Sequence, residues 1–146
     1  MARLFLRKTL TGFAPADGPS TETWKRYKLN EVYKSDVVKP RSYRHHCLAF
    51  ALLSLTFDNQ DRYDNFEHFR KAVAIAAGHV EELVTLDGEV LLQPKSISYD
   101  ALDEVEFTQV SAAMMAVCAR LLDVSEPELA AEVSRYADAT YGAVAA

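Results

Sequence analysis

Three side chains that can ligate zinc or act as nucleophiles stand together in the stretch KPRSYRHHC, residues 39–47. They are His45, His46 and Cys47, and the other candidates of these types are His68, His79 and Cys118. None of them shows the C-x2-C or H-x3-H spacing of a zinc site. On a helix, neighbouring residues point about 100° apart, so His45 and His46 are poorly placed to share one ion. We therefore expect no metal and no cofactor.

Motifs of catalysis are also missing from the sequence. It contains no G-x-S-x-G elbow, no P-loop and no G-x-G-x-x-G loop. Asp87, Glu89 and Lys95 offer groups that a metal-dependent nuclease uses, but Asp87-Gly88 is already explained as a hairpin turn. We expect a protein without catalytic residues that is not an enzyme.

Cations and aromatic rings are concentrated between residues 24 and 45, which is the pattern of a nucleic-acid interface. Lysine and arginine neutralise phosphates, and aromatic rings stack on unpaired bases. The stacking candidates are Trp24, Tyr27 and Tyr43. The phosphate-binding candidates are Lys25, Arg26, Lys28, Lys39, Arg41, Arg44 and His45.

The cations of KPRSYRHHC lie where the sequence predicts the start of a helix, with Ser42 as its N-cap. Positive side chains at that end oppose the helix dipole. The free backbone N–H groups of a helix start bind anions, however, and Arg41, Arg44 and His45 strengthen such a site. Two anions fit it: a DNA phosphate, or a carboxylate from the chain's own acidic half.

Charge is unevenly distributed along the 146 residues. Residues 1–46 carry a net charge of +6 and residues 47–146 a net charge of −11, within a total of −5. Such asymmetry indicates a surface that binds polyanions, or halves that neutralise each other in the fold. The longest apolar run, seven residues from Cys47 to Leu53, is too short to cross a bilayer. We expect a cytoplasmic protein that does not contact a membrane.

The elements that must position these residues follow from periodicity and turn signals. Strands are predicted at 2–8 and 31–39, a loop at 11–20, and a hairpin at 79–93 around Asp87-Gly88. Helices are predicted at 43–57, at 65–77 with Asp64 as cap and Gly78 at its end, from Ser98 or Asp100 to about Leu122, and from Ser125 to about Tyr141.

This order predicts an α+β fold: a small antiparallel sheet that includes the 79–93 hairpin, with about four helices packed on one side. Residues 1–124 form a single α+β domain in this prediction. Residues 125–146 form a C-terminal helix with a shallow apolar face, which packs on that domain or on a second subunit. A homodimer is one expectation from that face.

Several segments resemble a family of phage and prophage proteins known as DUF1367. They are LFL at 4–6, KPRSYRHHCLAFALLSL at 39–55, FEHFRKAVAIAAGHVEEL at 66–83 and LQPKSISYDALDEVEF at 92–107. The resemblance spans most of residues 2–122, and it departs from the family pattern at 43–46. It implies a bacteriophage-encoded protein from a region of DNA-metabolism genes, without an activity to carry over.

A shorter stretch, residues 41–55, is similar to a helix of the lambda NinB (Orf) recombination proteins, which bind single-stranded DNA. His45 and His46 stand in place of the Gln-Asn pair of that helix, and Phe50 stands at its aromatic position. This similarity implies a role beside recombination enzymes.

Two hypotheses of different classes follow. The first is a non-enzymatic accessory protein of phage DNA recombination or replication, which binds single-stranded or branched DNA through the basic candidates above. The second is a phage anti-defence inhibitor, similar in role to an anti-CRISPR protein, which binds a host protein complex through acidic residues. The candidate contacts of the second are Asp58, Asp61, Asp64, Glu81, Glu82 and Asp103.

Overall fold

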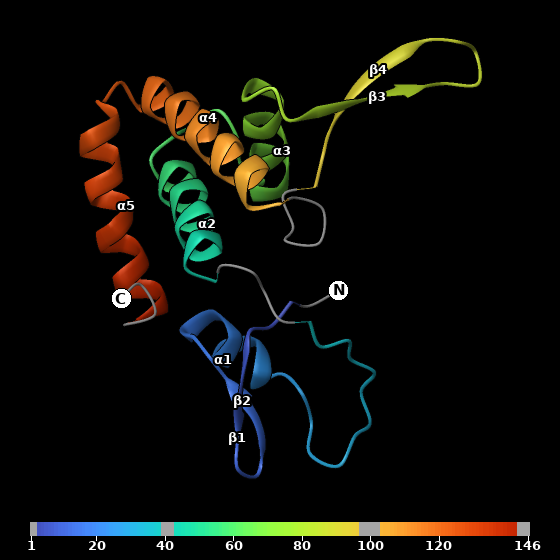
Figure 1. The fold of residues 1–146 in the computed structure, drawn as a ribbon, viewed down its shortest axis with the longest axis vertical. Helices are drawn as coiled ribbons and strands as arrows, with labels where there is room; N and C mark the ends of the chain where they lie inside the picture. The colour runs from blue at the N-terminus through green and yellow to red at the C-terminus, as the bar shows by residue number, and fades with distance from the viewer. Residues whose placement is uncertain (1–2, 39–42, 97–102, 143–146) are drawn as a thin grey trace.

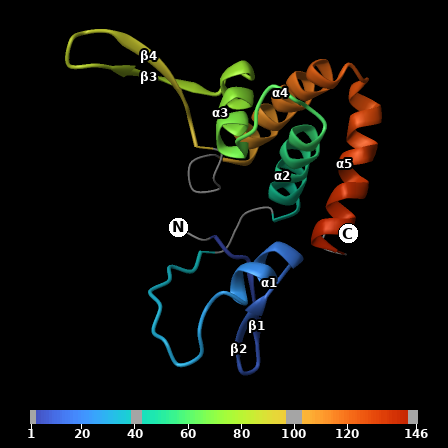
Figure 2. The ribbon, with the colours of Figure 1, turned by 180° about the vertical axis from the view of Figure 1, so that it is seen from behind.

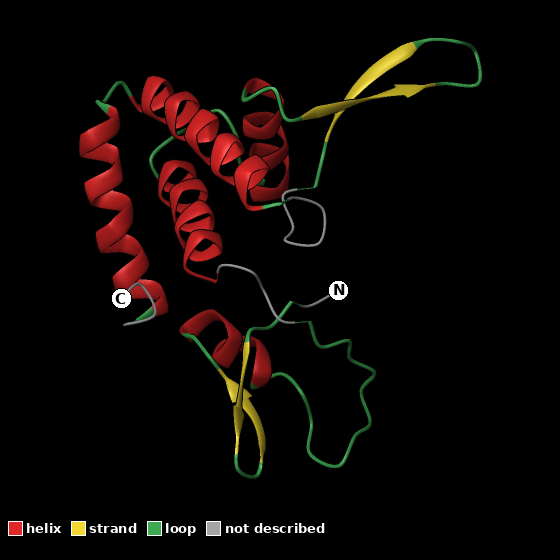
Figure 3. Ribbon diagram, viewed as in Figure 1, coloured by secondary structure: helices red, strands yellow, loops and turns green. Residues whose placement is uncertain are grey.

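The chain folds into a body of helices from which two short β-hairpins project (Figures 1 and 3). A computed structural model describes residues 3–38, 43–96 and 103–142. The elements within these ranges are, in order, β1 (Leu6–Thr9), β2 (Gly12–Pro15), α1 (Gly18–Trp24), α2 (Tyr43–Asp58), α3 (Phe66–Ala76), β3 (Val80–Val84), β4 (Val90–Pro94), α4 (Glu104–Leu122) and α5 (Glu126–Tyr141). The α+β class is confirmed, with five helices in the described residues where about four were expected.

The core lies among the helices, with α2 at its centre. This helix packs against α3, α4 and α5, and its residues Ala51 and Leu53 are fully buried. The neighbouring helices add Phe69, Val73, Met114, Cys118, Leu129, Val133 and Ala137 to the same cluster. The strands form two separate two-stranded sheets. The predicted single sheet with helices on one side is therefore wrong, because the helices bury their apolar stripes against one another.

The two C-terminal helices are both part of this core. In α5, Leu129, Val133 and Ala137 are buried against the rest of the chain, so its apolar face is covered within one molecule. Among the described residues, α4 is the one helix whose length and composition would suit a membrane span. In this fold α4 packs against α2, α3 and α5.

A side-chain cap marks the N-terminal end of most of the described helices. Asn65 caps α3, where Asp64 was predicted, since the Asn65 side chain accepts a hydrogen bond from the His68 N–H at 3.1 Å. Gly78, with a φ of 80°, follows the end of α3 as predicted. Ser125 caps α5 as expected.

The cap of α4 is Asp103. The caps that were expected for this helix, Ser98 and Asp100, lie outside the described residues. The expected cap of α2, Ser42, also lies outside them.

The N-terminal segment differs most from the prediction. The strand expected at 2–8 begins only at Leu6, and β1 pairs with β2, which lies inside the predicted loop at 11–20. Residues 31–38, predicted as a strand, form no helix or strand and are exposed along their whole length. A run of β-favouring residues becomes a strand only where a neighbouring strand offers its edge. Among the described residues, none does so here.

The hairpin predicted at 79–93 is confirmed as β3 and β4, which pair antiparallel from Val80 opposite Pro94 to Val84 opposite Val90. Its turn has three residues, Leu86 to Gly88, where a two-residue turn was expected. Thr85 N–H donates to the Glu89 carbonyl at 2.8 Å, and Gly88 takes a φ of 86°. The hairpin extends away from α3, on the side of the molecule opposite α5 (Figure 2).

Candidate functional site

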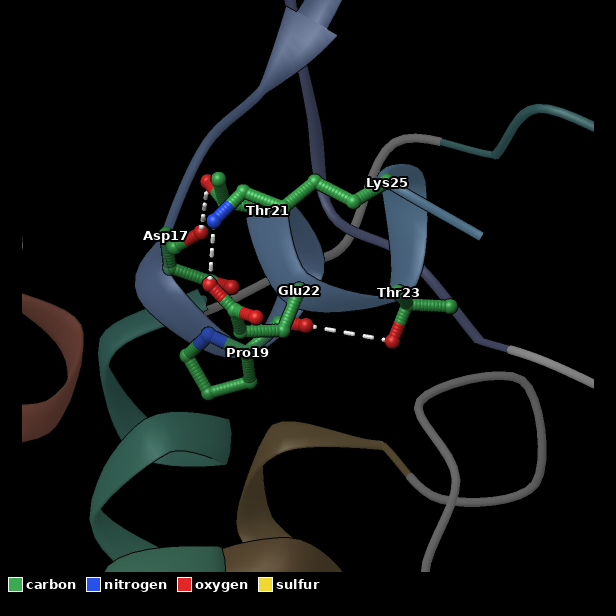
Figure 4. Close-up of polar contacts among 6 residues, drawn as sticks. All are labelled: Asp17, Pro19, Thr21, Glu22, Thr23 and Lys25. Atoms are coloured by element: carbon green, nitrogen blue, oxygen red, sulfur yellow. Dashed lines mark hydrogen bonds and ion pairs between the residues drawn. The ribbon is translucent and has the colours of Figure 1, made fainter. Parts of the chain in front are cut away.

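The short helix α1 carries the first predicted interface residues, and polar side chains fix its course. Asp17 is its N-cap and accepts a hydrogen bond from the Ser20 N–H at 2.7 Å. Figure 4 shows the hydroxyls of Thr21 and Thr23 donating back to the carbonyls of Asp17 and Pro19, at 2.8 and 3.1 Å. These bonds hold a seven-residue helix that would be marginal alone. The helix ends at Trp24 and so presents that ring at its C-terminus.

The start of α1 is anchored to the helical body. Asp17 also accepts a hydrogen bond from the hydroxyl of Tyr43, in the first turn of α2. On its other side, the Ser20 hydroxyl accepts the Phe5 N–H at 2.9 Å. A side chain at Gly18 would approach the carbonyl of Thr140, near the end of α5, to 3.0 Å. The segment from β1 to α1 therefore packs against the first turn of α2 and the last turn of α5.

Three aromatic rings gather at the end of α1 and in the loop that follows it, and we refer to Trp24, Tyr27 and Tyr33 as the aromatic cluster. The ring centroids of Trp24 and Tyr27 are 6.4 Å apart, and those of Tyr27 and Tyr33 are 4.6 Å apart, both edge to face. Trp24 is 42% exposed and Tyr33 is 47% exposed. The Tyr33 hydroxyl accepts the Lys28 N–H at 3.1 Å and donates to Glu31 at 2.7 Å. The cluster is thus held in place by its own loop.

Exposed cations adjoin the residues of the aromatic cluster in the sequence: Lys25, Arg26, Lys28 and Lys34. Lys25 pairs with Glu22 at 2.7 Å (Figure 4), and this hydrogen bond lowers the pKa of Glu22. Lys28 lies 3.9 Å from Glu31. All four partners in these two pairs are at least half exposed. Exposed ion pairs contribute little free energy, so these lysines can exchange their carboxylate partners for phosphates.

The remaining basic candidates lie at and before the start of α2, and only some of them fall within the described residues. Lys39 and Arg41 lie outside the described residues. Arg44 and His45 are exposed in the first turn of α2. Tyr43 is half-buried against Phe5, with ring centroids 4.6 Å apart, and its hydroxyl is engaged by Asp17. Its place is in the packing between α1 and α2, so it is not presented as a stacking surface.

The His-Cys pair at the end of KPRSYRHHC is buried. The pKa of His46 is lowered to about 4, chiefly by burial and also by the charge of Arg3, while Asp17 opposes the shift. The His46 ring packs between Phe5 and Phe50. Burial also raises the pKa of Cys47 to about 11, which disfavours the nucleophilic thiolate at neutral pH. Within the described ranges, no three His, Cys, Asp or Glu residues gather into a metal-binding group.

The acidic candidates are spread over the molecule. Asp58 ends α2, Asp61 and Asp64 lie between α2 and α3, Glu81 and Glu82 lie on β3, and Asp103 caps α4. All six are exposed. Asp103 has a structural task, because its carboxylate accepts the Glu106 N–H at 2.8 Å in a capping box. Glu81 is bonded across the hairpin to the amide of Gln93, at 3.0 Å.

A second group of cations, which sequence reasoning missed, lines a cavity of about 230 Å³ between α3, the end of β4 and α4. Its cations are Arg70, Lys71 and Lys95, over a floor that includes the buried Met114. Arg70 is paired with Glu67 at 2.7 Å, and this contact lowers the pKa of Glu67. Arg70 and Lys71 are adjacent on α3, whereas Lys95 follows β4, so no local pattern in the sequence groups all three.

Comparison with known proteins decides the family. The family model described as "Protein of unknown function (DUF1367)" matches residues 58–134, a little over half of the chain. The chain belongs to the DUF1367 family. The match begins later than the expected residue 2 and ends later than the expected residue 122. It includes the β3–β4 hairpin and the cation-lined cavity and leaves the aromatic cluster outside.

No curated protein and no solved structure matches the chain. The similarity of residues 41–55 to the NinB proteins is not shown by these comparisons. Membership of DUF1367 brings no activity to this chain, so function must be argued from its own residues.

Proposed function

We propose that this DUF1367 protein binds single-stranded DNA through the aromatic cluster and the cations around it, as a non-enzymatic accessory of phage DNA recombination or replication. The observation that carries the proposal is the exposure of Trp24 and Tyr33 on either side of Tyr27, with lysines and an arginine beside them. No catalytic step is part of this role.

The chemistry of the cluster favours single strands over duplex DNA. Rings that lie edge to face leave part of their faces to solvent, where an unstacked base can lie against them. Each base stacked on such a ring contributes about 1–3 kcal/mol to binding, and every base offers a suitable face. In a duplex the bases are already stacked, so only the phosphate contacts would remain.

The cations supply the second part of the interface. Lys25, Arg26, Lys28 and Lys34 alternate with the aromatic residues along a single segment, so a strand that stacks on the rings passes beside them. Arg44 and His45 are further candidates for phosphate contacts, since both are exposed in the first turn of α2. Phosphate contacts of this kind give affinity without sequence preference.

The alternative, an anti-defence inhibitor that acts through an acidic surface, has weaker support. Its candidate residues lie on α2, on the following loop, on β3 and at the start of α4, and one of them serves as a helix cap. Recognition of a partner's basic groove needs such charges on one continuous surface. We therefore retain single-stranded DNA binding as the proposed function.

Fluorescence anisotropy with a labelled oligonucleotide tests the proposal. We expect the protein to bind a single-stranded oligonucleotide at low salt, and to bind the corresponding duplex more weakly. Trp24→Ala and Arg26→Ala should each weaken binding to the single strand. The matched controls are Tyr63→Ala and Arg62→Ala, since both residues are exposed and lie in the loop before α3. Absence of binding, or equal loss in the controls, would contradict the proposal.

A further inference from the structure

The β3–β4 hairpin exposes apolar side chains on both of its faces. Val84, Val90 and Leu92 lie on one face, and Leu83 and Leu91 lie on the other, by the alternation of side chains along paired strands. All five are exposed, and Leu86 at the tip is 108% exposed. Apolar surface of this extent on a projecting element marks an interaction site. A hairpin of two strands is also marginally stable on its own, and a third strand is the usual remedy.

The outer edge of β3 is the edge that can accept a third strand. The Thr85 N–H donates to the Glu89 carbonyl, and the Lys95 N–H donates to the His79 carbonyl. Thr85 and His79 therefore direct their backbone groups inward, toward the partner strand, and in an antiparallel pair every second residue does so. By that alternation Val80, Glu82 and Val84 direct their N–H and C=O groups outward. On β4 the outward positions include Pro94, which has no N–H to offer. Within the described residues, β3 pairs with β4 alone.

The chain contains a segment suited to this edge. Residues 31–38, EVYKSDVV, have the composition of a strand but no strand neighbour in the described structure. Val32 is 99% exposed, and Val37 and Val38 are each more than 60% exposed. The chain thus displays an unpaired strand-like segment and an unpaired strand edge. Figures 1 and 2 place both on the side away from α5, but at different ends of the molecule.

We propose that residues 31–38 of a second copy add to the outer edge of β3 as a third, antiparallel strand. Because each copy has one segment and one edge, two such contacts related by a twofold axis close a dimer. Placing Lys34 opposite Glu82 sets Val32 opposite Val84, so a charge pair and an apolar pair form on one face. The hairpin from Val80 to Pro94 carries four acids and no cation. Residues 25–38 carry four cations and two acids, so the charges of the two surfaces are complementary.

This contact goes beyond single-stranded DNA binding and does not depend on it. Trp24 and Tyr27 precede the added strand in the chain, whereas Tyr33 and Lys34 belong both to this strand and to the proposed DNA interface. The association is measured without nucleic acid, so its failure is distinct from a failure of DNA binding.

Cysteine cross-linking tests the pairing and its register. The native Cys47 and Cys118 are buried, so introduced thiols report on the surface. We expect a mixture of Lys34→Cys protein and Glu82→Cys protein to form a disulfide-linked dimer under mild oxidation. The matched control mixes Lys34→Cys with Glu89→Cys, an exposed acid that lies beyond the paired edge. Cross-linking no greater than in that control would overturn the proposal.

The double variant Lys34→Cys/Glu82→Cys separates the two sources of the strand. Linked dimers support pairing between copies, whereas a monomer with an internal disulfide would show that the segment folds back on its own hairpin and would overturn the proposal.

Sedimentation equilibrium provides a second measurement. We expect the native chain to dimerise, and Val84→Asp to be monomeric with an unchanged circular dichroism spectrum, because Val84 lies outside the helical core. The matched control is Leu10→Asp, at the tip of the other hairpin, where Leu10 is 107% exposed. A monomeric native protein, or equal dissociation of the Leu10→Asp variant, would overturn the proposal.

Discussion

The hydroxyl of Tyr43, in the first turn of α2, donates a hydrogen bond to the carboxylate of Asp17, which caps α1. The two residues are 26 positions apart in the chain. A carboxylate of the same chain approaches the start of α2, and it comes from the basic N-terminal half.

Replacing Asp17 should therefore loosen the N-terminal segment. Asp17→Ala removes the cap of α1 and leaves the half-buried Tyr43 hydroxyl without this acceptor, and we expect a loss of about 2–3 kcal/mol in the free energy of unfolding. Tyr43→Phe removes only the hydroxyl and should cost about 1 kcal/mol. Urea denaturation of both variants and of the double variant measures the coupling between the two groups. Strictly additive losses would show that the two side chains do not interact.

His46 should make the protein less stable in mild acid. Its pKa falls from an ordinary value of about 6.5 to about 4 in the folded chain, chiefly by burial. Between these two values the unfolded chain binds a proton that the folded chain does not, so stability rises with pH across this range. As the pH falls from 6.5 to 4, up to about 3 kcal/mol should be lost through this group.

Denaturation in urea at a series of pH values measures this loss. His46→Phe keeps a ring between Phe5 and Phe50 and cannot titrate, so its stability should vary less over the same range. An unchanged pH profile in this variant would assign the acid sensitivity to other groups.

Salt dependence should separate the two kinds of contact proposed for DNA binding. Each phosphate contact with a single strand contributes about 0.7 to the slope of log affinity against log salt concentration. Arg26→Ala should reduce the slope by about that amount. Trp24→Ala should lower affinity at every salt concentration and leave the slope unchanged. A change of slope in the Trp24 variant would argue against stacking as the role of this ring.

Asp103 should act on stability through its capping box. Asp103→Ala removes the acceptor for the Glu106 N–H, and we expect a cost of about 1 kcal/mol in thermal or urea denaturation. Asp61→Ala is the control, since Asp61 is an exposed acid in the loop before α3 and caps no helix. Equal stability of the two variants would remove the structural role assigned to Asp103.

Local signals in the sequence predicted most of the helices. The apolar periodicity of α2 and α3, the Ser125 cap and Gly78 all act within a few residues of where they stand, and each predicted its element within one or two residues. The β3–β4 hairpin was equally accessible because Asp87-Gly88 is a local turn signal. The signal did not distinguish a two-residue turn from the three-residue turn that forms.

Features that depend on distant partners were not accessible in this way. Residues 31–38 have strand composition, but a strand also needs an edge beside it, which no property of the segment itself provides. The same holds for the burial of Tyr43 against Phe5 and for the cavity cations Arg70 and Lys95, which packing brings together. The exposure of Trp24 follows from its place at the end of α1.

The hydrogen bond from the Lys95 N–H to the His79 carbonyl, at 3.0 Å, closes the base of the β3–β4 hairpin. The chain leaves the helical body and returns to it at one point, so the hairpin is topologically an insertion. Evolution can lengthen, shorten or replace such an insertion without rearranging the helices that carry it. A family built on this plan can vary its projecting arm from one member to the next and keep the same body.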